Sequence, residues 1–180
     1  MRARLVPPVG PDDHTSGPPN APITLVEYGD FECPHCGAAY PILERVRERL
    51  GDRLQFVYRH FPLAESHPHA EHAAEIAEAA GEYGRFWEMH ATLFQHQDAL
   101  DDDSLVQYAT AVGVDPNSAA NALIAGTFAD RVRAQFMSGV RSGVNGTPTL
   151  FINGARYDLT LNERVLLATL ERAALADSSA

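Results

Sequence analysis

Residues 23–36 read ITLVEYGDFECPHC, and this stretch decides the fold. Its first part, residues 23–28, is β-branched and mostly apolar, which is typical of a buried central strand. Cys33 and Cys36 follow, and Pro34 between them suits the first turn of a helix. Apolar side chains then recur at helical spacing, at Ala39, Ile42, Leu43, Val46 and Leu50. The stretch therefore predicts a strand followed at once by a helix with a cysteine pair at its start.

Downstream of this helix, the pattern predicts a second strand and then a helical segment. Pro41 predicts a kink in the first helix, and residues 54–59 have the composition of a strand. Residues 66–144 have helical spacing, with breaks expected at Gly81, Gly84, Gly113 and Gly126. Three stripes are expected to face the core: Phe86, Met89, His90, Leu93 and Phe94; Leu105, Tyr108, Ala109 and Val112; and Phe128, Val132, Phe136 and Val140.

The C-terminal part returns to strands. Residues 149–152 and 155–158 are strand-like and enclose Asn153-Gly154, a strong signal for a tight hairpin turn. Thr160 and Glu163 have the spacing of a capping box, which predicts a last helix that packs Val165, Leu166, Leu170 and Ala173. The whole order of elements indicates an α/β fold with a helical insertion.

Composition excludes several classes of protein. The 180 residues carry a net charge of −10, which argues against a nucleic-acid partner because phosphate binding needs a basic surface. The sequence has no apolar run long enough to span a bilayer, which predicts a soluble protein. Residues 1–22 show no apolar segment of an export signal, so we expect a cytoplasmic protein, or an extracytoplasmic one if a signal has been removed.

Cys33 and Cys36 are the only cysteines, which excludes a disulfide-rich scaffold and a four-cysteine metal site within one chain. Their position at the start of a helix after a buried strand favours a redox pair. The helix N-terminus stabilises an anion, so the first thiol ionises readily, and the second lies close enough to attack a mixed disulfide. His35 between them adds a positive neighbour when it is protonated.

The sequence resembles the DsbA-like thiol:disulfide oxidoreductases, which have a thioredoxin fold. The resemblance is strongest in two segments, from Ile23 to Leu50 with its CPHC motif and from Gly143 to Tyr157 with Val144-Asn145-Gly146-Thr147-Pro148, and His67-Pro68-His69-Ala70 also looks like a family feature. It implies an α/β thioredoxin fold with an inserted all-helical subdomain. The parts expected are an N-terminal arm (residues 1–22), a first thioredoxin half (23–63), the helical insertion (64–142) and a second half (143–176).

The resemblance also implies a role for each site residue. Cys33 is the attacking thiolate and Cys36 the buried resolving thiol, while Pro34 and His35 between them set the redox poise. Glu27 matches the buried acid that relays a proton for the second cysteine. Thr147 and Pro148 match the substrate-binding loop, whose cis-proline faces the cysteines.

The function implied is exchange of disulfides with protein or peptide thiols through a mixed disulfide at Cys33. The resemblance implies no cofactor beyond the two sulfurs and no metal. It also implies a recycling partner, which is a membrane quinone-linked oxidase outside the cytoplasm, or a thioredoxin or glutathione system inside. A monomer is expected, because residues 1–22 are too few for the dimerisation domain of the isomerase branch. The CPHC motif at a helix start favours a depressed pKa for Cys33 and an oxidising pair.

Other interpretations stay open at this point. A cytosolic thiol reductase or redox sensor agrees with the missing export signal, and a metal carrier would use Cys33, Cys36 and histidines. Glu27 points to solvent if its strand lies at an edge, although its apolar neighbours favour burial. The histidines at positions 67, 69 and 72 are expected on a solvated face rather than around a metal. Asp101-Asp102-Asp103 is expected to supply negative charge at a helix start.

Overall fold

The structure is a computed structural model, and it describes residues 3–177. The chain clusters into two compact units. The first contains the residues up to Gly29, Ala38–Arg59 and those from Ser138 onward, and the second contains Asp30–Gly37 and His60–Met137. The chain therefore passes between the units several times, and the CPHC motif belongs to the second.

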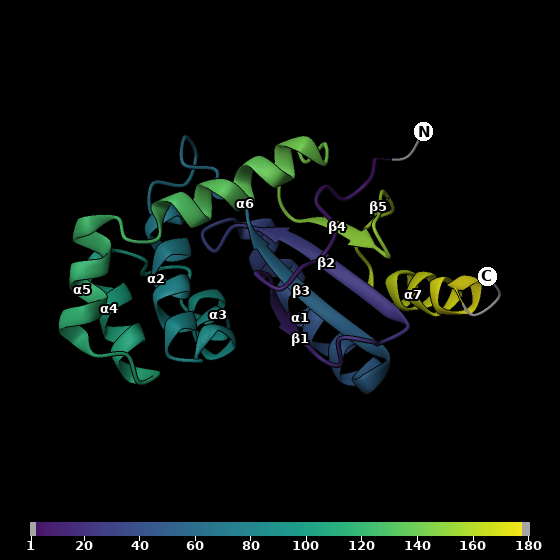
Figure 1. The fold of residues 1–180 in the computed structure, drawn as a ribbon, viewed down its shortest axis with the longest axis horizontal. Helices are drawn as coiled ribbons and strands as arrows, with labels where there is room; N and C mark the ends of the chain where they lie inside the picture. Colours follow the sequence, from purple (N-terminus) through teal and green to yellow (C-terminus); the bar gives the residue numbers. More distant parts are fainter. Residues whose placement is uncertain (1–2, 178–180) are drawn as a thin grey trace. The chain divides into compact units, whose positions relative to one another are not determined.

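A five-stranded sheet organises the first unit (Figure 1). The strands are β1 (His14–Ser16), β2 (Ile23–Gly29), β3 (Leu54–His60), β4 (Thr149–Ile152) and β5 (Ala155–Tyr157), in the order β1-β3-β2-β4-β5. β1 is antiparallel to β3, and β4 is antiparallel to both β2 and β5. Helix α1 (Pro34–Leu50) and the short 3-10 helix η1 (Gly51–Arg53) connect β2 to β3, and α7 (Glu163–Asp177) follows the sheet. The predicted α/β class is confirmed.

The predicted hairpin between β4 and β5 is also confirmed. Asn153 and Gly154 both have positive φ angles, 46° and 78°, which is the conformation that a two-residue turn of this kind requires. The Asn153 side chain also accepts a hydrogen bond of 2.7 Å from the backbone N–H of Thr24. The turn is thereby attached to the start of β2.

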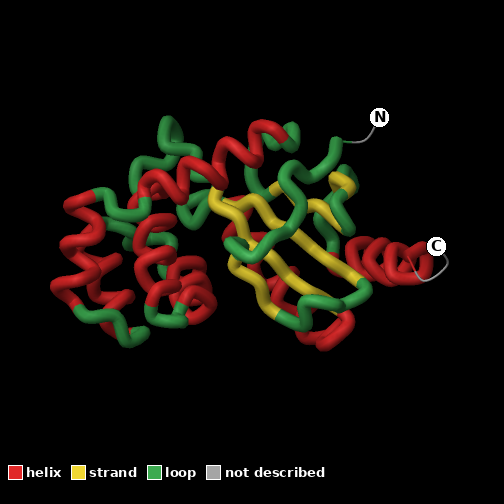
Figure 2. The backbone as a smooth tube through the Cα atoms, viewed as in Figure 1, coloured by secondary structure: helices red, strands yellow, loops and turns green. Residues whose placement is uncertain are grey.

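The N-terminal segment differs from the arm that its prolines predict, because it adds backbone to both edges of the sheet. Residues His14–Ser16 form β1 along β3, and Arg4 forms an isolated bridge with Ala155 of β5. The backbone N–H of Leu5 donates to the carbonyl of Gly154 at 2.9 Å. Between these points the segment is a loop, drawn in green in Figure 2. The segment therefore supplies one edge strand, only three residues long, and a bridge to the strand at the other edge, and so short an edge strand limits pairing with other chains.

A buried ion pair fastens the N-terminal segment to the sheet. The guanidinium of Arg59, on β3, donates to both carboxylate oxygens of Asp13 at 2.8 Å. It also donates to the carbonyls of Pro7 and Pro8 and to the hydroxyl of Tyr28. Burial alone would lower the pKa of Arg59, but Asp13 and Tyr28 outweigh it and the pKa is raised. The N-terminal segment therefore both buries the positive charge of Arg59 and supplies its counter-charge.

The second unit is helical, and aromatic and small side chains form its core. Its helices are α2 (Ala70–Glu82), α3 (Phe86–Gln95), α4 (Asp102–Ala111), α5 (Pro116–Ala125) and most of α6 (Ala129–Arg141). The first predicted stripe, from Phe86 to Phe94, is buried, as are Leu105, Ala109 and Val132 of the other two. Asp101 and Asp115 cap α4 and α5 by accepting from the N–H groups of Ser104 and Ser118, so the negative charge predicted at Asp101-Asp102-Asp103 does lie at a helix start.

Three local predictions were wrong. Gly81 does not end a helix but lies inside α2, because Gly84 supplies the positive φ of the turn that follows. Val140 and Val165 are exposed rather than packed in the core. The last helix is capped by Asn162, whose side-chain oxygen accepts from two N–H groups of its first turn, and not by a box at Thr160.

Replacement of Asp13 by Asn should destabilise the protein. The Asp13→Asn variant leaves the buried Arg59 guanidinium without its counter-charge, so we expect the free energy of unfolding to fall by about 3 kcal/mol. Urea denaturation measures this. The exposed neighbour serves as the control, since Asp12→Asn should change the free energy by no more than about 0.5 kcal/mol. Equal effects of the two substitutions would contradict a structural role for the ion pair.

Candidate active site

Both cysteines lie at the start of helix α1, as predicted. The carbonyl of Cys33 accepts a 3.0 Å hydrogen bond from the N–H of Gly37, so Cys33 is the capping residue and Cys36 lies in the first turn. The side chains are buried thiols, with Cys33 3% exposed and Cys36 fully buried. The first turn holds no acidic residue, and the positive end of the helix dipole acts on the cysteines. Pro34 and His35 are exposed.

The loop that leads into this helix is organised by Asp30, a buried residue that the sequence analysis did not single out. The Asp30 carbonyl accepts the N–H of Cys33 at 3.1 Å. Its carboxylate accepts the N–H groups of Glu32 and Leu63, each at 2.8 Å. The same carboxylate lies 2.7 Å from Nδ1 of His67. One carboxylate therefore connects the cysteine loop to the segment that follows β3.

His67 is the basic group of this cluster, and its side chain is only 17% exposed. Burial alone would lower the pKa of His67, but the hydrogen bond with Asp30 and the charges of Asp30, Cys33 and Glu32 outweigh it and raise the pKa. A protonated His67 and a Cys33 thiolate therefore favour one another. The prediction that His67 lies on a solvated face was wrong, because its ring pairs with the buried carboxylate of Asp30. The His72 side chain, 43% exposed and 2.6 Å from Asp102, does meet the prediction.

Gln97 is a second site residue that the sequence analysis missed. Its side-chain amide donates to the carbonyls of Phe31 and Cys33, at 2.7 and 3.0 Å. Gly37 makes this approach possible, because a Cβ atom there would lie only 1.9 Å from Oε1 of Gln97. The glycine directly after CPHC was the available signal, but nothing in the sequence names its distant partner. Gln97 thus fixes the backbone that carries the attacking thiol.

Phe31 anchors the same loop to the helical core. Its ring is buried and lies 5.0 Å from Phe94, 5.7 Å from His90 and 5.8 Å from His60, measured between ring centroids. Such tilted and edge-on aromatic pairs are favourable beyond their buried area. The cysteine loop therefore has an apolar anchor and polar anchors within one unit.

Glu27, Thr147 and Pro148 belong to the first unit. Glu27 lies on β2, is 2% exposed and pairs in register with Leu150 of β4, so the expected burial is confirmed. The Thr147–Pro148 bond is cis, as the resemblance implies, and directly precedes β4. The structure thus brings Glu27 and the proline loop onto neighbouring strands of one sheet.

Within residues 3–177, no group of three or more His, Cys, Asp or Glu side chains is arranged to hold a metal ion. In the same range, every helix is too short or too polar to cross a bilayer.

A family model described as thioredoxin matches residues 10–172 of this chain. The chain belongs to the thioredoxin family. The matched range includes both cysteines, Glu27 and the Thr147-Pro148 loop. The CPHC helix and the proline loop therefore lie within the thioredoxin match.

This thioredoxin-family chain is similar to two groups of known proteins, one by sequence and one by structure. The Na(+)/H(+) antiporter NhaA 1 of Salinispora arenicola is 45% identical over 172 residues, which cover 94% of this chain but 26% of the antiporter. The chain thus spans about a quarter of the length of the curated relatives that it matches.

The second group consists of solved structures. BdbD from Bacillus subtilis matches with a TM-score of 0.86 and 21% identity, over 97% of this chain and 100% of BdbD. The thiol-disulfide exchange protein alpha-DsbA2 from Wolbachia pipientis matches with a TM-score of 0.75 and 20% identity, over 89% and 86%. The predicted thioredoxin fold and the resemblance to DsbA-like proteins are confirmed at the level of the fold.

Removal of the His67 charge should make the Cys33 thiolate harder to form. In the His67→Asn variant we expect the midpoint of thiolate formation to rise by roughly half a pH unit to one unit. Absorbance at 240 nm, followed during a pH titration, measures this. His72→Asn is the matched control, because that histidine pairs with Asp102 instead.

The stability of the same variant should depend on pH. A histidine whose pKa is raised in the folded state stabilises the protein below about pH 6.5, and this contribution is lost as the pH rises through the folded value. The destabilisation by His67→Asn should therefore be larger at pH 5 than at pH 9. An equal loss at both values, with an unchanged thiolate midpoint, would contradict this role of His67.

Proposed function

We propose that this chain is a dithiol:disulfide oxidoreductase that acts on protein or peptide thiols. The observation that carries this proposal is the position of Cys33 at the N-cap of α1, with Cys36 in the same turn and the Asp30–His67 pair beside them. Helix dipole and imidazolium both stabilise a thiolate, which is the reactive form in disulfide exchange. The relation in fold to a thiol-disulfide exchange protein supports the same class.

The reaction needs only the two sulfurs. In the oxidising direction, a substrate thiolate attacks Sγ of Cys33 in the Cys33–Cys36 disulfide, and the Cys36 thiolate leaves. A second substrate thiolate then attacks the substrate sulfur of this mixed disulfide and releases the Cys33 thiolate. The substrate loses two electrons and two protons. The cysteine pair takes up the two electrons, Cys36 takes up one proton, and the other proton passes to solvent while Cys33 remains a thiolate.

The remaining site residues have supporting roles in this proposal. Glu27 moves a proton to and from Cys36, which agrees with a carboxyl buried in β2. Thr147 offers its backbone to an extended substrate segment, and Pro148 shapes that loop. Pro34 and His35, exposed between the cysteines, adjust the redox poise.

The direction of exchange determines the partner and the compartment. We propose that the chain is an oxidant, which requires a quinone-linked membrane oxidase for recycling and an oxidising compartment. A reductase or sensor would instead draw electrons from thioredoxin or glutathione inside the cell. We propose a monomer in both cases.

A comparison of melting temperatures tests the direction. A thiolate that the folded protein stabilises adds stability above the titration range of a free thiol, about pH 8.5, and loses it as the pH falls. A disulfide that closes a loop of about four residues contributes roughly 2 kcal/mol in the chain-entropy model. For an oxidant, stabilisation of the thiolate exceeds this contribution of the disulfide, so the reduced form should melt at a higher temperature than the oxidised form at pH 7. The difference between the two melting temperatures should narrow at lower pH. An oxidised form that melts higher at pH 7 would indicate a reductase.

A second candidate function follows from the antiporter relatives. A stretch of Na(+)/H(+) antiporter NhaA 1 is 45% identical to nearly all of this chain. We propose that the exchange activity serves a membrane cation antiporter, whose cysteines the Cys33–Cys36 pair would oxidise or reduce. The chain would then regulate ion transport through the thiol state of its partner.

Trapping of mixed disulfides tests both functions. In the Cys36→Ser variant the attacking thiol has no resolving partner, so disulfide adducts with substrates should accumulate. Cys33→Ser is the matched control and should trap none. Mass spectrometry of non-reduced extracts identifies the trapped proteins, and an antiporter among them would support the second function. Equal trapping by both variants would contradict the assigned roles.

A further inference from the structure

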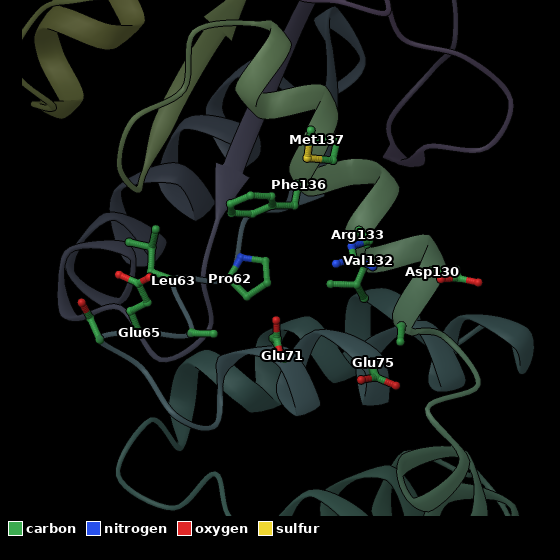
Figure 3. A pocket seen from close by; sticks show the side chains of 13 residues that line it. Pro62, Leu63, Glu65, Glu71, Glu75, Asp130, Val132, Arg133, Phe136 and Met137 are labelled. Carbon is green, nitrogen blue, oxygen red and sulfur yellow. The ribbon is translucent and has the colours of Figure 1, made fainter.

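The second unit contains a pocket of about 590 Å³. Its walls come from residues 62–66 after β3, from α2 and from the first part of α6 (Figure 3). Pro62, Val132 and Phe136 form an apolar surface, and the Phe136 ring is stacked on Phe61 with centroids 4.3 Å apart. The volume lies within the roughly 300–1,000 Å³ of ligand sites in proteins.

The polar side chains around this pocket are mostly acidic. Glu65, Glu71, Glu75 and Asp130 carry negative charge, against one positive charge on Arg133. In Figure 3, Glu71 and Glu75 lie on α2, and the side chains of α6 are drawn above them. An apolar surface with an excess of carboxylates is complementary to a ligand that has an apolar body and a positive charge.

Glu75 distinguishes this pocket from a merely acidic surface. It is 6% exposed, and its Oε2 is buried and has no hydrogen-bond partner among residues 3–177. Burial raises the pKa of Glu75, and the negative charge of Glu71 raises it further. His72 and the backbone of Phe128 act in the opposite direction but do not cancel the rise. A buried carboxylate oxygen without a partner is costly, and a cation bound at the carboxylate would offset that cost.

The pocket is connected to the cysteine loop within the same unit. The N–H of Leu63, a lining residue, donates to the Asp30 carboxylate at 2.8 Å. The carbonyl of Asp30 accepts the N–H of Cys33. A segment bound in the pocket is therefore held on the unit that presents the attacking thiol.

We propose that this pocket binds a lysine of a protein substrate together with its apolar neighbours in sequence. The ammonium would pair with the carboxylate of Glu75, and the neighbours would lie on Pro62, Val132 and Phe136. This inference rests on the proposed function, because the continuity with the cysteine loop is what favours a substrate segment over a free organic cation.

Lysine fits this site better than arginine does. Only a small part of the Glu75 carboxylate is open to the pocket, because the residue is 6% exposed and its Oε2 is buried. Arginine binds carboxylates best through two parallel hydrogen bonds, whereas lysine acts as a point charge. The long apolar stem of lysine can also extend along Val132 and Phe136 to reach a recessed carboxylate.

Titration with a peptide that lacks cysteine tests the inference. The probe is acetyl-Phe-Lys-Leu-amide, and the matched peptide has norleucine in place of lysine. By calorimetry or NMR we expect the lysine peptide to bind roughly tenfold or more tightly than the norleucine peptide, the size of one charge-assisted hydrogen bond. Glu75→Gln should abolish this difference, whereas Glu82→Gln, elsewhere on α2, should preserve it.

Several outcomes would overturn the inference. They are equal binding of the two peptides, no binding of either, an unchanged preference in Glu75→Gln, or equally tight binding of n-butylamine. Glu75→Gln should also raise the melting temperature by roughly 2 to 4 °C, because it removes a buried charge. The wild-type comparison of the two peptides remains decisive if this variant is unstable.

Disulfide exchange is measured separately on a thiol substrate. Binding without exchange would contradict the proposed function alone, and exchange without lysine preference would contradict the pocket alone.

Discussion

The buried carboxylate of Asp30 sets the geometry of the candidate active site. A carboxylate removed from water must have its oxygens satisfied, so the N–H groups of Glu32 and Leu63 and the ring of His67 converge on it. These groups come from two loops that are far apart in sequence. The convergence places a titratable base near Cys33, and the same residue's carbonyl holds the Cys33 N–H. One desolvated charge thus determines backbone position and local electrostatics together.

In the first unit the buried charge is positive, and it too must find hydrogen-bond partners within the protein. The guanidinium of Arg59 is buried, and its donors are met by Asp13, by the carbonyls of Pro7 and Pro8 and by Tyr28. Because Asp13 and the two carbonyls come from the N-terminal segment, that segment must lie on the sheet, where it forms the edge strand β1 and a bridge to β5. A proline-rich stretch thereby becomes part of the fold.

The second unit contains two different electrostatic environments, one around Cys33 and one around the pocket. The start of α1 and His67 favour negative charge at Cys33, whereas α2 and α6 present carboxylates around an apolar surface. Leu63 belongs to both, since its backbone binds Asp30 and its side chain lines the pocket. This arrangement combines an activated thiol with a surface suited to basic, apolar segments.

Patterns of neighbouring residues were enough to predict much of this protein. The strand before CPHC, the helix that begins there, the Asn153-Gly154 hairpin and the burial of Glu27 all follow from spacing and composition, because each is decided by residues close in sequence. The roles of Asp30, Gln97 and Arg59 did not follow. Each depends on a partner that only folding brings near, such as the carbonyl of Cys33 for Gln97, and the position of Glu75 in a pocket has the same origin. The sequence around a polar residue suggests that it is exposed to water. Only tertiary packing decides whether it is buried and which group then forms its hydrogen bonds.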